Sequence, residues 1–208
     1  MSHALDSPRR PTYADIEALP PHVVGEILGG ELVVSPRPAV PHATAMSQLG
    51  AALIPPFDRG LGGPGGWRIL DEPELSLGVD PDYDPVVPDL AGWRISVMPE
   101  ALQTAQVHLV PQWVCEVVSP RSQRTDRVLK LPFYARAGVG HVWLIDPLSE
   151  TLEVYALHDA EWRLRGSYGG DATVRAEPFD AVPLELTWLW GRRPAADAGA
   201  EADPAVDR

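Results

Sequence analysis

Proline and glycine divide this chain into short segments along most of its length. There are 23 Pro and 18 Gly among 208 residues, and neither residue type is favourable inside a long helix or a central strand. The sequence therefore predicts short elements joined by many loops. Hydrophobic residues still make up 45% of the chain, and Pro plus Gly stay below the roughly 25–30% of low-complexity chains, so we expect a packed core.

The length of the chain suits one ordinary domain. Residues 1–11 form a polar lead, residues 12–190 carry the helix and strand patterns, and residues 191–208 are rich in Ala, Asp, Glu and Pro. We expect a flexible lead, a single domain and a disordered tail over these three ranges.

The order of the patterns predicts a mixed α/β (α+β) domain. A short helix capped by Thr12 precedes an N-terminal β-hairpin, formed by residues 22–28 and 31–35 around Gly29-Gly30. Apolar residues at helical spacing predict a helix over 42–53 that ends at Pro55-Pro56. A second helix is predicted over 128–137, ending at Gly138, and strands are predicted at 67–77, 85–93, 112–118, 141–146 and 151–157.

Several classes of protein are excluded by composition. The longest charge-free stretch, residues 38–57, contains four prolines, so it is no apolar transmembrane segment. The N-terminus lacks the apolar core of a signal peptide. The single cysteine, Cys115, cannot form an internal disulfide or a Cys-based zinc cage. We expect a cytoplasmic protein with no membrane partner.

The formal net charge of −12 argues against broad, non-specific nucleic-acid binding, which depends on Lys and Arg. The segment 121–136 is an exception, because it holds five basic residues and one acid. Arg121, Arg124 and Arg127 in this segment predict a local patch that attracts anions.

Two carboxylates stand out as candidates for chemistry. Glu116 lies inside the apolar run Trp113–Val118, where a buried carboxylate is costly unless it is paired or binds a cation. Side chains alternate across a strand, so Cys115 and Val117 should face away from Glu116. Asp89 follows Pro88 at the start of another apolar strand. Each also has a plainer interpretation: a half-exposed or salt-bridged glutamate for Glu116, and a turn residue for Asp89.

Lys130 is the only lysine in the chain, beside 16 arginines. A bias towards arginine explains most of this difference, and a lysine that survives it is a candidate for a site where arginine does not fit. Two carboxylates and a lysine form a known catalytic arrangement. The carboxylates hold Mg²⁺ (or Mn²⁺) through oxygen, and the lysine orients water or stabilises charge on a phosphate.

These residues resemble the PD-(D/E)xK nuclease superfamily and, more closely, its Uma-two family. The resemblance covers roughly residues 12–190. Its matching segments are 25–36, His42, 87–90, 116–120, 126–139 and 143–147.

The resemblance implies a restriction-endonuclease-like fold, a central mixed β-sheet flanked by helices. It also implies that Asp89 and Glu116 bind the metal and that Lys130 is catalytic. In the superfamily the lysine lies two residues after the acid, where this chain has Val118. Lys130 would supply the positive charge from the next helix instead. Pro132 predicts that this helix starts late or is kinked.

Four further residues are candidates for a supporting role. Glu26 either reaches the site or keeps the hairpin turn soluble. His42 either lies behind the site or simply begins a helix. Asp126 is four residues before Lys130, a spacing that also fits a surface ion pair. Tyr134 is expected to pack in the core with its hydroxyl bonded nearby.

The sequence favours a Mg²⁺-dependent endonuclease acting on DNA, as a homodimer, because cutting two strands needs two sites. Two alternatives stay open. The first is a catalytically silent nuclease-fold module that binds a protein or nucleic-acid partner. The second is a hydrolase of a small phosphorylated molecule.

Overall fold

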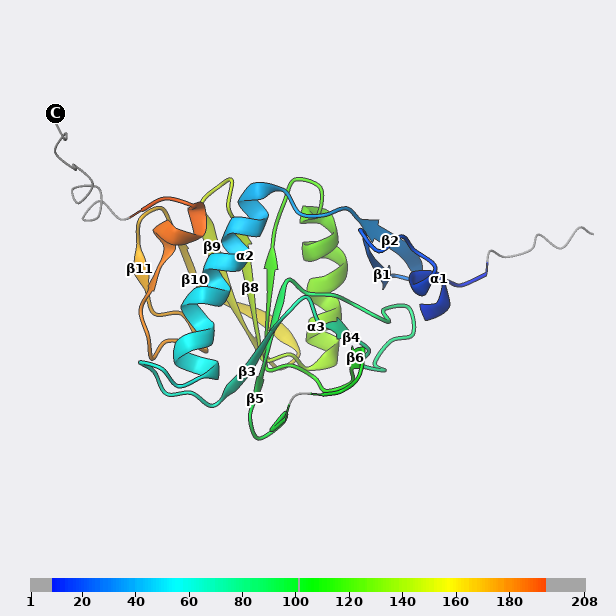
Figure 1. Ribbon diagram of the computed structural model, residues 1–208, viewed down its shortest axis with the longest axis horizontal. Helices are drawn as coiled ribbons and strands as arrows, with labels where there is room; N and C mark the ends of the chain where they lie inside the picture. Colours follow the sequence, from blue (N-terminus) through cyan, green and yellow to red (C-terminus); the bar gives the residue numbers. More distant parts are fainter. Residues whose placement is uncertain (1–8, 101, 194–208) are drawn as a thin grey trace, which may run out of the picture.

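The computed structural model describes residues 9–100 and 102–193. Its centre is a six-stranded mixed sheet in the order β10-β9-β8-β7-β5-β3 (Figure 1). Only β7 and β8 pair in parallel; the other neighbours are antiparallel. The strands are β3 (Trp67–Asp71), β5 (Leu90–Arg94), β7 (Trp113–Val117), β8 (His141–Asp146), β9 (Thr151–His158) and β10 (Glu161–Gly169).

Two helices cover the two faces of this sheet. Helix α2 (Val40–Leu53) packs Ala45, Leu49 and Leu53 against one face. Helix α3 (Leu131–Ala137) packs Phe133 and Tyr134 against the other. Figure 1 shows the sheet between the cyan α2 and the green α3. The prediction of a central mixed sheet flanked by helices is therefore confirmed.

The N-terminal hairpin is also confirmed. Strands β1 (Val24–Leu28) and β2 (Glu31–Ser35) pair around Gly29 and Gly30. Both glycines have positive φ, 62° and 77°, as this tight hairpin turn requires. The short helix α1 (Tyr13–Glu17) precedes the hairpin. Its N-terminus is capped by Thr12, whose backbone N–H and hydroxyl both donate to the Asp15 carboxylate.

Three predicted boundaries are wrong. The helix predicted over 42–53 does not end at its prolines but continues as a π-helical turn, η1 (Ile54–Asp58). The strand predicted over 67–77 breaks after Asp71, and β4 (Glu74–Leu75) pairs with β6 (Gln106–Val107) in a separate sheet. The strand predicted over 85–93 begins only at Leu90, because two prolines in 85–88 remove ladder donors.

Helix α3 begins at Leu131, so the helix predicted over 128–137 does start late, next to Pro132. A π-helical segment, η2 (Thr125–Lys130), runs directly into α3 and places Pro132 in its first turn. The N–H of Leu131 reaches back to the carbonyl of Asp126, the wider spacing of a π-turn. Helix α3 ends as predicted, with Gly138 in the left-handed region at φ 80°.

The last described elements pack on the same side of the sheet as α2. Strands β11 (Thr173–Val174) and β12 (Leu184–Glu185) form a small sheet, followed by the 3-10 helix η3 (Leu186–Trp190). The predicted lead falls mostly, and the predicted tail almost wholly, outside the described residues. In the part of the chain that is described, no helix is long and apolar enough to cross a membrane.

Candidate active site

The site begins where β5 and β7 lie side by side. Their antiparallel register pairs Leu90 with Cys115, so Asp89, one residue earlier, lies beside Glu116. The N–H of Val117 donates to Asp89 Oδ2 at 2.6 Å, which fixes this carboxylate against β7. The side chain of Asp89 is 13% exposed and that of Glu116 only 3%. Glu116 is therefore not the half-exposed glutamate of the plain interpretation, whereas Asp89 does lie in a bend, directly before β5.

Glu116 points to the α3 face of the sheet, opposite to Cys115 and Val117. Those two residues pack with the α2 cluster, whereas Val114 and Val118 pack with the α3 cluster. The hydroxyl of Tyr134 donates to Glu116 Oε1 at 2.5 Å. Lys130 Nζ donates to Glu116 Oε2 at 3.3 Å. Both oxygens of this buried carboxylate thus have a partner from the η2–α3 segment.

Lys130 is buried at the centre of the cluster, with 4% of its surface exposed. Besides Glu116, its Nζ donates to the backbone carbonyl of Val87 at 2.8 Å and lies 2.9 Å from Glu26 Oε1. Lys130 ends η2, and its ammonium points inward to Glu116 of the interior strand β7. The displaced lysine therefore does reach the two carboxylates.

Three of the four supporting candidates lie in the same cluster. Glu26 is 5% exposed, so its interpretation as a solubility residue is wrong. Asp126 is 3% exposed and forms no ion pair with Lys130 in the described structure, so the surface pair is wrong too. Tyr134 is fully buried as expected. Asp126 Oδ2 has no hydrogen-bond partner among the described residues, so it is a buried acceptor that is still open.

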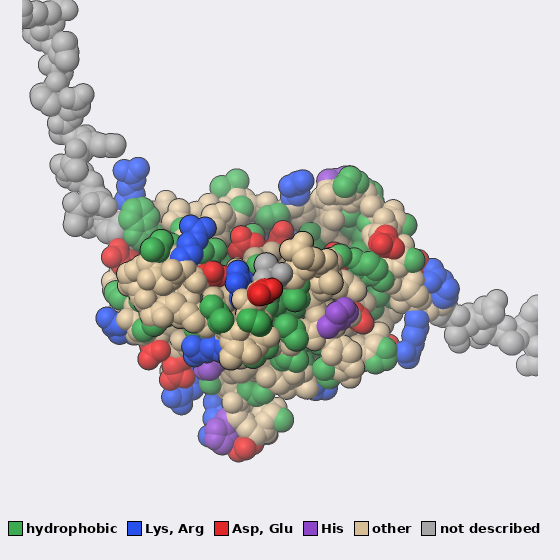
Figure 2. Space-filling view, turned by 60° about the horizontal axis from the view of Figure 1, so that its bottom comes forward, with side chains coloured by type: hydrophobic (Ala, Val, Ile, Leu, Met, Phe, Trp, Pro, Cys, Tyr) green, Lys and Arg blue, Asp and Glu red, His purple; other side chains and the backbone are tan. Residues whose placement is uncertain are grey.

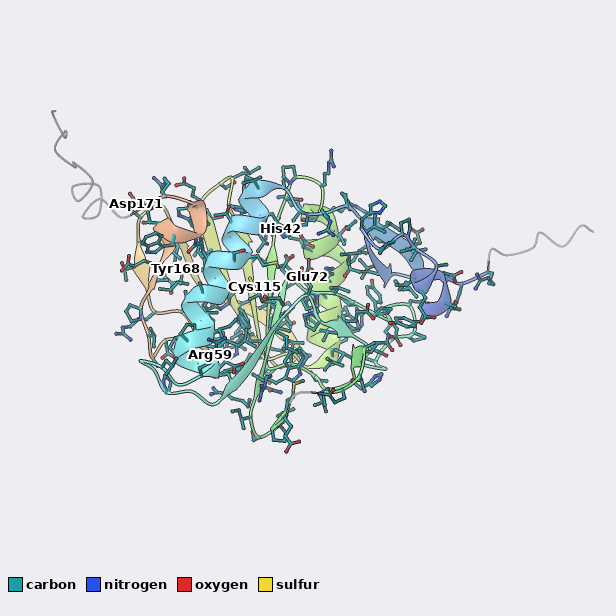
Figure 3. All side chains as sticks on the ribbon, viewed as in Figure 1. His42, Arg59, Glu72, Cys115, Tyr168 and Asp171 are labelled. Atoms are coloured by element: carbon teal, nitrogen blue, oxygen red, sulfur yellow. The ribbon has the colours of Figure 1, made fainter. Side chains whose placement is uncertain are left out.

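His42 approaches the site from the other helix. It lies in the first turn of α2, at the end of the helix seen at the top of Figure 3. Its Nε2 is 2.9 Å from Asp89 Oδ1, although the contact lacks the geometry of a hydrogen bond. Burial lowers the pKa of His42, so the imidazole is neutral at pH 7 and adds no compensating charge.

The charges of the cluster do not balance. Four carboxylates, those of Glu116, Glu26, Asp126 and Asp89, act on the single ammonium of Lys130. Burial lowers the pKa of Lys130, but these four acids raise it by more, so the net shift is upward. Lys130 stays charged, and three negative charges remain in excess if every acid is ionised.

This excess appears in the acids themselves. Burial raises the pKa of Asp89 to about 7, against the opposing effects of Lys130 and the Val117 N–H. Burial also raises the pKa of Glu116 well above its usual range, and it raises that of Asp126. Near neutral pH the cluster therefore retains a proton that a second cation could replace.

One acid at the site was not singled out from the sequence. Glu72 follows β3, and its N–H donates to the carbonyl of Asp89 at 3.0 Å. Its φ of 45° is unusual for a residue with a side chain, and its charge contributes to the raised pKa of Asp89. The sequence feature that could have drawn attention to Glu72 is the acidic pair Asp71-Glu72 immediately before Pro73.

The predicted basic patch is only partly free to meet an anion. Arg127 is ion-paired with Glu153 at 2.7 Å, and Glu153 also accepts from Tyr155. Arg121 and Arg124 are exposed, with no ion-pair partner among residues 9–100 and 102–193. On the face drawn in Figure 2, basic side chains are scattered among acidic ones.

The donors suit a hard cation that keeps part of its water shell. In the described segments, no three His, Cys, Asp or Glu side chains converge into a metal-holding group. Asp89 and Glu116 offer two carboxylates, the number through which Mg²⁺ is often bound. The open oxygen of Asp126 and the charge excess show that these residues fit a divalent cation.

Comparison with known proteins identifies the fold and the family of the chain. No curated protein matches the chain. Among solved structures, the crystal structure of "a putative nuclease belonging to DUF820" from Anabaena variabilis ATCC 29413 has the same fold. It is 21% identical, with a TM-score of 0.59, over 81% of this chain and 90% of that one.

A family model covers nearly the whole described domain. It matches residues 11–188, and its description is "Putative restriction endonuclease". This match supports a nuclease-like function. The chain belongs to the Uma2 (Uma-two) family.

Proposed function

We propose that this protein is a metal-dependent endonuclease that hydrolyses phosphodiester bonds in DNA. The observation that carries the proposal is the buried cluster of four carboxylates around one ammonium on the α3 side of the sheet. Such an excess of negative charge is costly inside a protein unless a cation joins it. The family supplies the reaction class, since its description names a restriction endonuclease.

Asp89 and Glu116 would hold the cation, Mg²⁺ or Mn²⁺. When bound, such a cation lowers the pKa of a water molecule and polarises a phosphoryl oxygen. Glu116 is kept in place by the hydroxyl of Tyr134, and Asp89 by the Val117 N–H. Lys130 brings the fixed positive charge that stabilises the negative charge building on the phosphate.

The remaining residues support this centre or the substrate. His42 closes the α2 side of Asp89, and Asp126 adds negative charge behind Lys130. Arg121 and Arg124 would attract the DNA backbone, whereas Arg127 first has to leave Glu153. We expect a homodimer, which places one site on each strand, acting in the cytoplasm.

The test is cleavage of supercoiled plasmid and single-stranded DNA with Mg²⁺ or Mn²⁺. The variants Asp89→Ala, Glu116→Ala and Lys130→Ala should each lower the rate by about 10²–10³-fold or more. The matched control is Asp159→Ala, an acid on the β9–β10 turn with an 82% exposed side chain. Cleavage that persists in EDTA, or in both acid variants, would disprove the proposal.

A second candidate is a catalytically silent module with the nuclease fold. It is favoured by the fact that both oxygens of Glu116 and the ammonium of Lys130 already have protein partners. Calorimetric titration with Mn²⁺ separates the two functions. A folded protein that neither binds Mn²⁺ at millimolar concentration nor cuts DNA is the silent module.

A further inference from the structure

Glu26 is the acid of the cluster that lies farthest along the chain from the others. It comes from the hairpin, yet its Oε1 accepts the backbone N–H of Val87 at 2.7 Å and lies 2.9 Å from Lys130 Nζ. The hairpin is fixed to the same segment by two backbone bonds, from Ile27 to Pro85 and from Gly30 to Asp82. These hydrogen bonds to residues 82–87 hold the hairpin in place, and with it Glu26 beside Lys130.

The contacts of Lys130 are unequal. Its ammonium is 2.8 Å from the Val87 carbonyl and 2.9 Å from Glu26, but 3.3 Å from Glu116. The two shorter contacts both involve the Val87 region, because Glu26 itself is bonded to the Val87 N–H. Glu116 has a closer partner of its own in Tyr134, at 2.5 Å. Lys130 is therefore held mainly by partners other than Glu116.

This inequality matters for a site that has to admit a cation. If Glu116 were the only acid holding Lys130, occupation of Glu116 would leave a buried ammonium without a partner, which is strongly unfavourable. With Glu26 and the Val87 carbonyl in place, Lys130 stays compensated when Glu116 is occupied.

We propose that Glu26 is a positioning residue, which anchors Lys130 beside the carboxylates so that the ammonium keeps a partner when Glu116 binds a cation. This inference rests on the proposed function. It assigns a task to the hairpin, whose strand β1 carries the anchor, and it separates the acids by role. Glu26 serves the lysine, while Asp89 and Glu116 serve the cation.

The single lysine makes the anchor directly observable. In protein labelled with ¹⁵N-lysine, the Nζ group gives one resonance, because no other lysine exists in the chain. A buried, bonded ammonium should exchange its protons with water slowly enough to be detected at neutral pH. We expect this signal in the wild type without any metal.

Substitutions then distinguish the two acids. Glu26→Gln keeps an oxygen for the Val87 N–H but removes the charge that holds Lys130, so the Nζ protons should exchange at least about 10-fold faster. Glu116→Gln should keep the slow signal, and so should Glu31→Gln, an exposed glutamate of the same hairpin. A signal lost in Glu116→Gln but kept in Glu26→Gln would overturn the anchor.

Folding and activity provide the remaining controls. If Glu26→Gln does not fold, Glu116→Gln decides alone, since loss of its slow signal contradicts the proposal. In active protein, Glu26→Gln should lower kcat by about 10–100-fold with little change in KM, and Glu26→Asp should recover part of it. An unchanged kcat would refute the positioning role. A wild type that cuts no DNA would refute the proposed function, while the Nζ signals would still test the anchor.

Discussion

The two faces of β7 differ sharply although alternate residues of one strand supply both. Towards α2 the strand presents Trp113, Cys115 and Val117, which pack with Trp143 and Phe179 in an aromatic cluster. Towards α3 it presents Glu116 between Val114 and Val118. One face is filled with rings in contact, and the other encloses charges that do not balance.

This difference indicates that the two faces of the sheet contribute differently to stability and to the site. The α2 face should supply packing energy, because aromatic residues bury the largest areas. The buried acids on the α3 face should lower the stability of the folded protein, since burial raises their pKa values. Truncating a core ring on the α2 face and neutralising a buried acid on the α3 face should therefore move stability in opposite directions.

The largest expected effect lies on the aromatic face. Phe179 contacts the rings of Phe57, Trp67, Trp113 and Trp143 and is 2% exposed. Phe179→Ala should lower the free energy of unfolding by about 3–5 kcal/mol, measured by urea denaturation. The control Leu164→Ala, at a position 56% exposed, should change it by about 0.5 kcal/mol or less. Equal losses in both variants would break the comparison.

The next effect has the opposite sign. Glu116→Gln removes a buried charge whose pKa is raised by burial, so metal-free protein should become more stable by about 1–2 kcal/mol. The same variant should lose DNA cleavage. Urea denaturation in EDTA, paired with a plasmid cleavage assay, measures both. A destabilisation as large as that of Phe179→Ala would show that Glu116 is a structural residue.

A third prediction concerns pH. The folded protein binds a proton at Asp89 up to a pKa of about 7, whereas an unfolded aspartate releases it near pH 4. The free energy of unfolding should therefore fall as pH rises from about 4 to about 7, by at most about 1.4 kcal/mol per pH unit for this group, and then level off. Asp89→Asn should flatten this slope in EDTA. If Asp89→Asn leaves the pH dependence of the unfolding free energy unchanged, another acid of the cluster binds the proton.

The smallest effect is expected at Tyr134. Tyr134→Phe removes the hydroxyl that donates to Glu116 and should cost about 1 kcal/mol. Tyr155→Phe is the matched control, because its hydroxyl donates to the half-buried Glu153, and it should cost less. Thermal unfolding of the two variants side by side gives the answer. A larger loss in Tyr155→Phe would contradict the assigned importance of the buried bond.

Local chemistry explains which parts of the fold the sequence could predict. The Gly29-Gly30 turn, the Gly138 helix end and the apolar strand around Glu116 depend on residues that are neighbours in the chain. Residue type and position also singled out Asp89 and Lys130, and the resemblance assigned the roles of metal ligand and catalytic lysine. The cluster in the structure brings these three together.

The wrong predictions concern residues whose surroundings are set by partners far away in the sequence or by an unexpected helix type. Glu26 is bonded to Val87, which is 61 residues away, so nothing beside it in the sequence indicates that it is buried. Asp126 and Lys130 have the spacing of a surface ion pair on an α-helix, but η2 is π-helical, and its wider turns direct both side chains inward. The end of the first long helix at Pro55 and Pro56 was likewise predicted from local chemistry alone, whereas the chain continues from α2 into η1.

The burial of Lys130 also determines how the surface of this protein reacts. Because the chain has no other lysine and this one is 4% exposed, the folded protein offers amine-directed reagents no side chain beyond its α-amino group. Acylation, lysine-directed cross-linking and enzymatic tagging of lysine should reach Lys130 only when the α3 side of the sheet opens. The extent of lysine acylation over time would thus measure how often the buried charged cluster opens to solvent.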